Sequence, residues 1–193
     1  MAKQSTPGKV RIIGGKWRGR RLSLADAEIR PTSDRVRETL FNWLGYKVQG
    51  ARVLDLFAGS GALGFEAVSR GADKAVLVEK LSARAKHLRV QADILTSSEI
   101  EVLTMDTRYL IANTLSQSAI DGPCFDLIFL DPPFADTDLR ELCAKLESGG
   151  WIADDALIYL ELARDAIFPE LPEQWRLEKR QTAAKVCYAL ARR

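Results

Sequence analysis

The chain lacks the features that several common classes of protein require. All of its apolar runs stay below the ~20 residues that a membrane span needs, and residues 1–9 are polar and small, without the apolar core of a signal peptide. Three cysteines, Cys124, Cys143 and Cys187, match no zinc-site spacing, and the only histidine, His87, lies in a polar helical stretch. We therefore expect a cytoplasmic protein with reduced thiols, no membrane segment and no metal, and we place His87 on the surface.

Charge is unevenly distributed along the 193 residues. The first 30 residues carry eight Lys or Arg and two Asp or Glu, a net of +6, whereas the other 163 carry 20 basic and 24 acidic residues, a net of −4. The length and the hydrophobic content of 47% suit one compact domain. The basic end predicts a local contact with a polyanion. We accordingly divide the chain into a basic extension, residues 1–30, and a main domain, residues 31–193.

Apolar strand-like runs alternate with amphipathic helical runs from residue 52 onward. This rhythm predicts a parallel sheet with helices on both faces. The expected strands are Val53–Phe57, Ala75–Glu79, Ile100–Leu103, Phe125–Leu130 and Ala156–Glu161. The expected helices are Ala62–Arg70, Ser82–Leu95, Thr107–Ser118 and Asp136–Leu146, and another, capped by Ser33 or Asp34, carries Val36, Leu40, Phe41 and Leu44.

Both ends of the chain read as hairpins. Residues 10–24 form a short extended segment punctuated by glycines, and Trp175–Arg180 and Val186–Ala191 are two strand-like runs separated by polar residues. Together these patterns predict an α/β fold of the Rossmann-like type. Its mostly parallel seven-stranded sheet would close with an antiparallel hairpin and carry a short N-terminal β-hairpin extension.

A glycine-rich turn between a buried strand and a helix indicates a ligand site. Residues 59–64, Gly-Ser-Gly-Ala-Leu-Gly, fit the dinucleotide fingerprint, and Glu79 follows about twenty residues later. Such a turn lets the backbone approach a ligand closely. Asp55 lies at the end of the preceding strand, where a carboxylate would repel a pyrophosphate but suits a ligand with a cationic amino group. Glu79 can accept ribose hydroxyls, which a nicotinamide site would also require.

The second candidate motif is Asp131-Pro132-Pro133-Phe134, directly after a buried strand. In an open α/β sheet, ligands bind beyond the carboxyl ends of the strands, which places Asp131 near the glycine-rich turn. An exocyclic amine on a base is a poor nucleophile, and two acceptors on its N–H groups can orient its lone pair. The Asp131 carboxylate and the Pro132 carbonyl offer these acceptors, the prolines stiffen the loop, and Phe134 can stack on a flipped base.

These residues resemble the RsmD-type 16S rRNA guanine-N2 methyltransferases of bacteria. The resemblance covers nearly the whole chain, and its markers are residues 12–19, 30–44, 54–61 and 131–134. It implies a class I methyltransferase fold, S-adenosylmethionine as the methyl donor, and guanine 966 of 16S rRNA in the small ribosomal subunit as the substrate. One departure from the expected pattern lies at residues 183–186, where we expect a glycine in the closing hairpin turn.

The resemblance implies cofactor roles for Asp55, Gly59, Gly61, Glu79 and Asp106 and catalytic roles for Asp131, Pro132 and Phe134, and we add neighbouring residues to these two sets. The predicted catalytic positions are Asp131, Pro132, Pro133 and Phe134. The predicted cofactor positions are Asp55, Phe57, Ala58, Gly59, Ser60, Gly61, Glu79, Lys80, Asp106 and Thr107. Asp106 could accept the adenine amino group or simply cap the helix that follows it.

Basic residues of the extension and of the segment after it are predicted to bind RNA. They are Lys16, Arg18, Arg20, Arg21, Arg30, Arg35 and Arg37, together with Trp17 and Thr32. Trp17 could stack on a base or pack the hairpin onto the domain. The arginines of residues 30–37 could face the cleft or form a solvated helix face with Asp34 and Glu38.

Three rival functions remain open at this point. Another amino-group methyltransferase, acting on DNA adenine or a protein glutamine, would use the same Asp131–Phe134 motif. A nicotinamide oxidoreductase would use the glycine-rich turn and Glu79 but gives that motif no role. A non-catalytic RNA-binding or ribosome-assembly module would need neither site to be active. We expect a monomer in each case.

Overall fold

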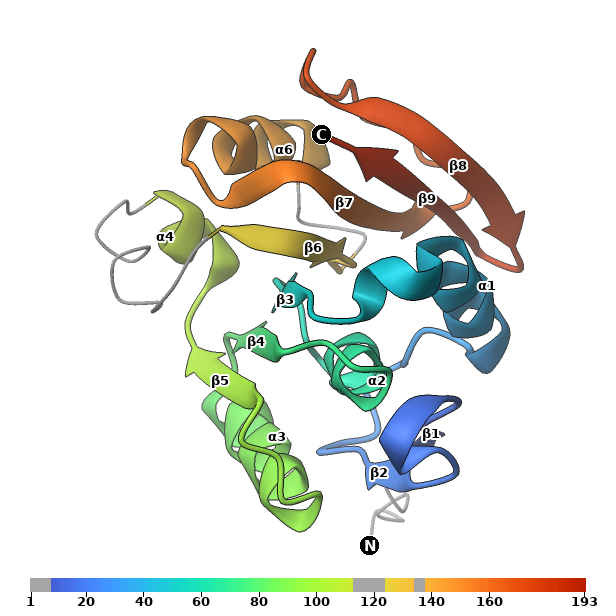
Figure 1. Cartoon of the computed structure of the whole chain (residues 1–193), viewed down its shortest axis with the longest axis vertical. Helices are drawn as coiled ribbons and strands as arrows, with labels where there is room; N and C mark the ends of the chain where they lie inside the picture. The colour runs from blue at the N-terminus through green and yellow to red at the C-terminus, as the bar shows by residue number, and fades with distance from the viewer. Residues whose placement is uncertain (1–7, 113–123, 134–137) are drawn as a thin grey trace, which may run out of the picture.

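A seven-stranded sheet forms the centre of the molecule (Figure 1). The computed structural model describes residues 8–112, 124–133 and 138–193. The strands lie in the order β5-β4-β3-β6-β7-β9-β8; the first five are parallel, and β9 is antiparallel to both β7 and β8. Their bounds are β3 (Arg52–Asp55), β4 (Lys74–Glu79), β5 (Ile100–Thr104), β6 (Phe125–Leu130), β7 (Ile152–Ala163), β8 (Arg176–Ala183) and β9 (Val186–Arg192). The predicted fold class is confirmed.

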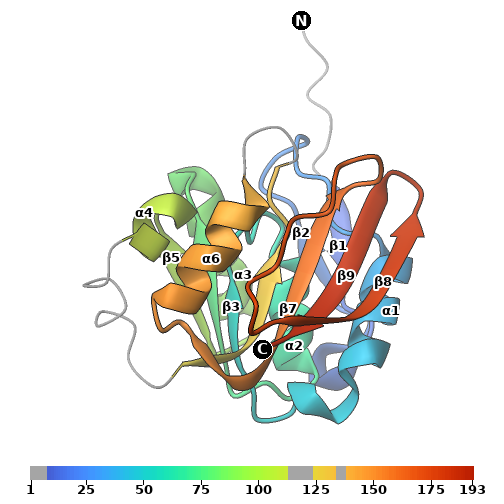
Figure 2. The same cartoon turned by 90° about the horizontal axis from the view of Figure 1, so that it is seen from above.

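Helices cover both faces of this sheet (Figures 1 and 2). Helices α1 (Asp34–Leu44), α2 (Ala62–Ser69) and α3 (Ser82–Ile94) share one apolar cluster with alternate residues of the strands. Helices α4 (Thr107–Ala112) and α6 (Leu139–Ser148) share a second cluster with the other set of alternate residues. Since both faces are buried, the central strands read as continuous apolar runs rather than as alternating ones.

The strand order reverses between β3 and β6. From β3 the chain winds outward through β4 to β5, and it then returns to place β6 on the other side of β3. The loops that follow β3 and β6 therefore diverge at their carboxyl ends and leave a crevice, which is where open α/β sheets bind ligands. The glycine-rich turn and Asp131 follow these two strands directly.

Most element boundaries fall within a few residues of their predicted positions. Ser33 caps α1, since its hydroxyl oxygen accepts a hydrogen bond from the Val36 N–H at 3.3 Å. A short 3-10 helix, η2 (Gly45–Val48), follows α1. Helix α6 begins at Leu139 with Asp138 as its cap, later than predicted; Asp136 lies outside the described residues. The predicted helix Thr107–Ser118 is described only as far as Ala112.

The N-terminal hairpin packs against the outer side of α2. Strands β1 (Lys9–Arg11) and β2 (Arg21–Ser23) pair antiparallel around a 3-10 turn, η1 (Gly15–Trp17). Its apolar residues join the cluster of α1 and α2. His87 on α3 is half-buried rather than fully at the surface, because its ring nitrogen lies 2.7 Å from the Ser23 carbonyl oxygen. The division at residue 30 remains a prediction, but residues 8–24 share the core of the main domain.

A single buried carboxylate, Glu66 on α2, fastens the hairpin and α1 to that helix. It is 0% exposed and accepts four hydrogen bonds. The backbone N–H groups of Ile13 and Gly14 donate at 2.8 Å each, Arg37 donates at 3.2 Å, and Arg70 donates at 2.7 Å. Because both oxygens are fully used and two partners are cations, the cost of burying the charge is offset locally.

The closing hairpin turns without glycine. Strand β8 extends to Ala183 and β9 starts at Val186, so the turn consists of Ala184 and Lys185. Ala184 has a φ of 49°, in the left-handed region that favours glycine. The predicted departure from the family pattern thus corresponds to a strained alanine at a position that lines the cleft.

Candidate active site

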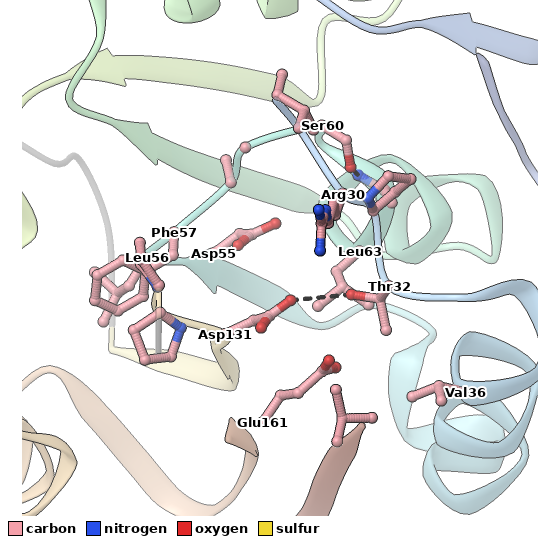
Figure 3. A pocket seen from close by; sticks show the side chains of 18 of the residues that line it. Arg30, Thr32, Val36, Asp55, Leu56, Phe57, Ser60, Leu63, Asp131 and Glu161 are labelled. Carbon is pink, nitrogen blue, oxygen red and sulfur yellow. Dashed lines mark hydrogen bonds between the residues drawn. The ribbon is translucent and has the colours of Figure 1, made fainter. Parts of the chain in front are cut away.

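One large cleft, of about 1290 Å³, lies at the carboxyl ends of β3, β4, β6 and β7 (Figure 3). Its wall combines parts of the chain that are distant in sequence. They are the segment 28–36 before and within α1, the turn after β3 with the start of α2, the residues at or just after the ends of β4, β5, β6 and β7, and the turn between β8 and β9. The cleft therefore brings together the two motifs on which the sequence-based prediction depends.

The turn after β3 is shaped by close packing. A side chain on Gly61 would meet the Phe65 ring at 2.6 Å, and one on Gly64 would meet Leu77 at 2.7 Å. Gly61 also has a φ of 75°, so neither position tolerates another residue without movement. The first residues of α2, Ala62 and Leu63, line the cleft, and a helix N-terminus is a favourable end for polar ligand groups.

Asp55 lies beneath this turn and is almost fully buried. It is 2% exposed, and its carboxylate accepts a hydrogen bond from the Gly64 N–H at 3.2 Å. Burial raises its pKa to about 7, and the nearby Asp131 carboxyl adds to the rise. A buried carboxylate beside a second one favours a cationic ligand group, because a positive charge would offset both the burial of the Asp55 charge and its repulsion by Asp131.

The residues predicted to hold a cofactor mostly line the cleft. Among those predicted positions, the cleft wall contains Asp55, Phe57, Ala58, Gly59, Ser60, Glu79, Lys80, Asp106 and Thr107. Gly61 does not line the cleft but packs against Phe65 and so shapes the turn. Glu79 is 7% exposed and accepts the Leu81 N–H at 2.8 Å. A glycine cradle with acids at the ends of β3 and β4 fits a nucleoside that carries an amino group.

Two of these residues are also engaged with the backbone. The Asp106 carboxylate accepts the Arg108 N–H at 2.8 Å, so it caps α4 and at the same time faces the cleft. Both readings of Asp106 are therefore compatible with its position. Thr107 is buried, and its hydroxyl donates to the Leu56 carbonyl oxygen, which ties α4 to the turn after β3.

Asp131 projects into the cleft directly after β6. The Thr32 hydroxyl donates to its carboxylate at 3.0 Å, linking the segment before α1 to the end of the sheet (Figure 3). Burial raises the Asp131 pKa to about 6, against the lowering effect of the Thr32 hydrogen bond. Pro132 and Pro133 continue along the cleft wall. Phe134 lies outside the described residues.

A further carboxyl, that of Glu161, lines the same cleft and is not among the site residues predicted from the sequence. It stands at the end of the predicted strand Ala156–Glu161, so a signal was present: a charged residue at the carboxyl end of an apolar run. It is 4% exposed, and burial and the neighbouring Asp131 raise its pKa to about 8. No group of three potential metal ligands forms among the described residues, so this acid cluster does not suggest a metal site.

The arginines of residues 30–37 divide into two groups. Arg30, Thr32 and Arg35 line the cleft, which is one of the two places that the sequence leaves open for this segment. Arg37 does not, and its prediction as an RNA contact is wrong. It is 1% exposed, and its guanidinium donates to Glu66, Asp34 and the backbone carbonyls of Thr32 and Arg11. Its role is to fix α1 against α2.

The hairpin residues that were predicted to bind RNA divide into one buried residue, Trp17, and four exposed cations. Trp17 is 9% exposed, its ring centroid lies 6.5 Å from that of Phe65, and its backbone N–H donates to the Ser69 hydroxyl. It therefore packs the hairpin onto the domain, and a base-stacking role is not available to it. Lys16 is exposed and forms an ion pair with Glu99. The cations Arg18, Arg20 and Arg21 are exposed on the hairpin and stand outside the cleft.

Within the part of the chain that the structure describes, no helix is long and apolar enough to span a bilayer. The fold, with its cleft at the switch point of the sheet, is that of a class I methyltransferase. Magnesium protoporphyrin IX methyltransferase from Synechocystis, solved with bound S-adenosylmethionine, shares this fold with a TM-score of 0.59 at 15% identity, over 82% of this chain and 78% of that one.

Closer relatives establish the family. The family model described as Conserved hypothetical protein 95 matches residues 10–192, and the chain belongs to this family. Curated relatives named ribosomal RNA small subunit methyltransferase D include those of Escherichia coli, 43% identical over 98% of this chain and 92% of that protein, and of Haemophilus influenzae, 40% identical over 98% of each. A solved Escherichia coli structure superposes with a TM-score of 0.87 at 41% identity, over 96% of this chain and 98% of that one.

Proposed function

We propose that the chain transfers a methyl group from S-adenosylmethionine to the exocyclic N2 amino group of a guanine in 16S rRNA of the small ribosomal subunit. The observation that carries the proposal is that Asp131 and the glycine-rich turn after β3 share one cleft. Neither a nicotinamide enzyme nor a binding module gives Asp131 a role there. The names of the curated relatives support rRNA as the substrate class.

The residues around the turn fit the cofactor by charge and shape. Asp55 and Ser60 would face its amino acid part, Glu79 would accept the ribose hydroxyls, and Asp106 would accept the adenine amino group. Gly59 and Gly61 leave room for the backbone to approach it. When bound, the cofactor supplies an electrophilic methyl group on a positively charged sulfur and departs as a neutral thioether.

The residues after β6 act on the amine. The Asp131 carboxylate and the Pro132 carbonyl would each accept one N–H of the amino group, which turns its lone pair toward the methyl carbon. As the new N–C bond forms, positive charge develops on the nitrogen, and the Asp131 carboxylate stabilises it. One proton then leaves the nitrogen for Asp131 or water. Thr32 holds Asp131 in place, and Phe134 would stack on the flipped base.

The exposed basic surface would hold the RNA backbone. Lys16, Arg18, Arg20 and Arg21 on the hairpin, with Arg30 and Arg35 at the cleft, are the cations that we assign to phosphate contacts. We also propose that the protein acts as a monomer in the cytoplasm, where small subunits assemble.

A methyl-transfer assay with radiolabelled cofactor tests the function directly. It compares small subunits from cells that lack the modification, free 16S rRNA and duplex DNA, and the labelled nucleoside is identified by mass spectrometry. We expect label in N2-methylguanosine from small subunits. Label in N6-methyladenine would keep the reaction but replace the substrate, and binding of subunits without any transfer would favour a non-catalytic module.

A further inference from the structure

Glu161 and Asp131 lie level with each other at the ends of neighbouring strands. Strands β6 and β7 are parallel, with Leu130 opposite Leu160 and Phe129 opposite Tyr159. Because side chains alternate between the faces of a sheet, Asp131 and Glu161 project to the same side, that of α1 and α2. Both line the cleft, and the Glu161 carboxylate points into the space beside Asp131 and Thr32 (Figure 3).

Glu161 is not held there as half of an ion pair. Among the described residues it has no ion pair with a cation, and its hydrogen bond comes from the Tyr159 hydroxyl, which donates to one carboxylate oxygen at 2.6 Å. Tyr159 is 0% exposed, and its ring meets those of Phe129 and Tyr188. A rigid, uncharged donor thus orients a buried acid that has Asp131 as a neighbour. Such an arrangement costs stability unless a ligand uses it.

The atoms beside the reacting amine differ between the bases. In guanine two ring nitrogens flank the carbon that bears the N2 amino group: N1, which carries a hydrogen, and N3, which is an acceptor. In adenine the nitrogen beside N6, and in cytosine the nitrogen beside N4, is an acceptor with a lone pair. An acidic side chain next to the amine-binding carboxylate favours guanine when it is ionised, since a carboxylate can only accept hydrogen bonds. Burial raises the Glu161 pKa in the free protein, and an N1–H that donates to the carboxylate would lower that pKa again and favour the ionised form.

We propose that Glu161 accepts the N1–H of the substrate base while Asp131 and Pro132 hold its amino group, so that Glu161 selects guanine over adenine and cytosine. The inference rests on the proposed function and adds the residue that reads the base. Tyr159 is a positioning residue, because it touches Glu161 and not the substrate. Adenine and cytosine lack the N–H that Glu161 would accept, and the lone pair on their ring nitrogen would repel the carboxylate. Polar mismatches of this kind give strong discrimination between substrates.

The test uses 2-aminopurine, which keeps the N2 amino group of guanine but has an acceptor at N1. Small subunits are reconstituted with RNA that carries either base at the target position, and the full-length enzyme is assayed on both. We expect the wild type to methylate 2-aminopurine at least 100-fold more slowly than guanine. If the wild type methylates both bases at equal rates, that result alone overturns the inference.

Two variants complete the test. In Glu161→Gln the amide can donate to N1 of 2-aminopurine, so we expect the preference for guanine to fall to within about tenfold while guanine transfer drops. In Tyr159→Phe we expect slower transfer with the preference retained. An unchanged preference in Glu161→Gln would show that another group reads N1. A wild type that leaves guanine unmethylated would refute the proposed function itself, and the inference with it.

Discussion

Replacing Glu66 by glutamine should weaken the packing of the N-terminal hairpin and α1 against α2 and lower the free energy of unfolding. The amide keeps the shape of the side chain but has one oxygen in place of two. Each carboxylate oxygen of Glu66 accepts two donors, one backbone N–H and one arginine N–H. Whichever way the amide turns, its NH₂ group faces two donors that have lost their acceptor. The Arg37 guanidinium, 1% exposed, also loses its fully buried counter-ion.

The magnitude follows from these losses. Breaking one side of a buried ion pair costs about 3–5 kcal/mol, and hydrogen bonds to charged groups contribute about 1.5–3 kcal/mol each. These two figures describe the same loss, and Asp34 continues to pair with Arg37. We therefore expect the free energy of unfolding to fall by about 4 kcal/mol, a large part of the roughly 5–15 kcal/mol that a domain of this size has.

Urea unfolding followed by circular dichroism measures this loss. With a slope of about 2 kcal/mol per molar urea, the midpoint should move down by about 2 M. The matched control is Glu141→Gln, which removes a carboxylate from an exposed ion pair with Lys145 and should change stability by less than about 0.5 kcal/mol. A loss below about 1 kcal/mol in Glu66→Gln would refute the reasoning, because it would mean that the four hydrogen bonds do not hold the elements together.

Three further changes have expected outcomes of different kinds. Ala184→Gly should raise the free energy of unfolding by about 1 kcal/mol in the same urea experiment, because a φ of 49° is strained for alanine; no gain would contradict the assigned turn geometry. Cofactor affinity, measured by calorimetry, should be about tenfold weaker at pH 6 than at pH 8, because the Asp55 pKa is raised to about 7 in the free protein and the side chain must ionise to bind an ammonium group. The control variant Asp55→Asn should bind the cofactor weakly and with little dependence on pH. A wild-type affinity that does not change with pH would mean that Asp55 does not bind the amino group. Replacing the three exposed hairpin arginines by alanine should weaken binding to small subunits and reduce the dependence of affinity on salt by up to about three phosphate contacts, and an unchanged salt slope would place the RNA elsewhere; these residues are Arg18, Arg20 and Arg21.

The parts of the fold that depend on local pattern could be predicted from the sequence. The strands of the parallel sheet are apolar on both faces and end in turn residues, so their order along the chain and their approximate bounds were correct. The cap of α1 could be narrowed to Ser33 or Asp34 because capping chemistry is local, and the structure shows that it is Ser33. The boundary of α6 was less certain, since several polar residues before Leu139 could serve as its cap.

Errors arose where a distant partner decides the role of a side chain. The sequence predicts that Arg37 faces the cleft or lies on a solvated helix face with Asp34 and Glu38, whereas it is 1% exposed. Its main buried partner, Glu66, lies 29 residues away on another helix, and nothing in the local sequence marks that pair. Trp17 could equally have stacked on a base, and only the position of Phe65 decides that it packs inside.

Glu161 was missed for a different reason. It is the last residue of the predicted strand Ala156–Glu161, but unlike Asp55 and Asp131 it belongs to none of the motifs that predict the site. The register of β7 against β6 brings it level with Asp131, and that register depends on long-range pairing. A role for Glu161 in the site can therefore be inferred only from the folded sheet.

The central claim is that one cleft binds the cofactor with the residues after β3 and β4 and activates the amine with Asp131. The most direct measurement is a pair of assays on Asp131→Ala: calorimetric binding of S-adenosylmethionine, and formation of N2-methylguanosine in undermodified small subunits detected by mass spectrometry. We predict cofactor affinity within a few-fold of the wild type and no detectable N2-methylguanosine. Near-normal methylation, or a collapse of cofactor affinity in a folded variant, would contradict the account.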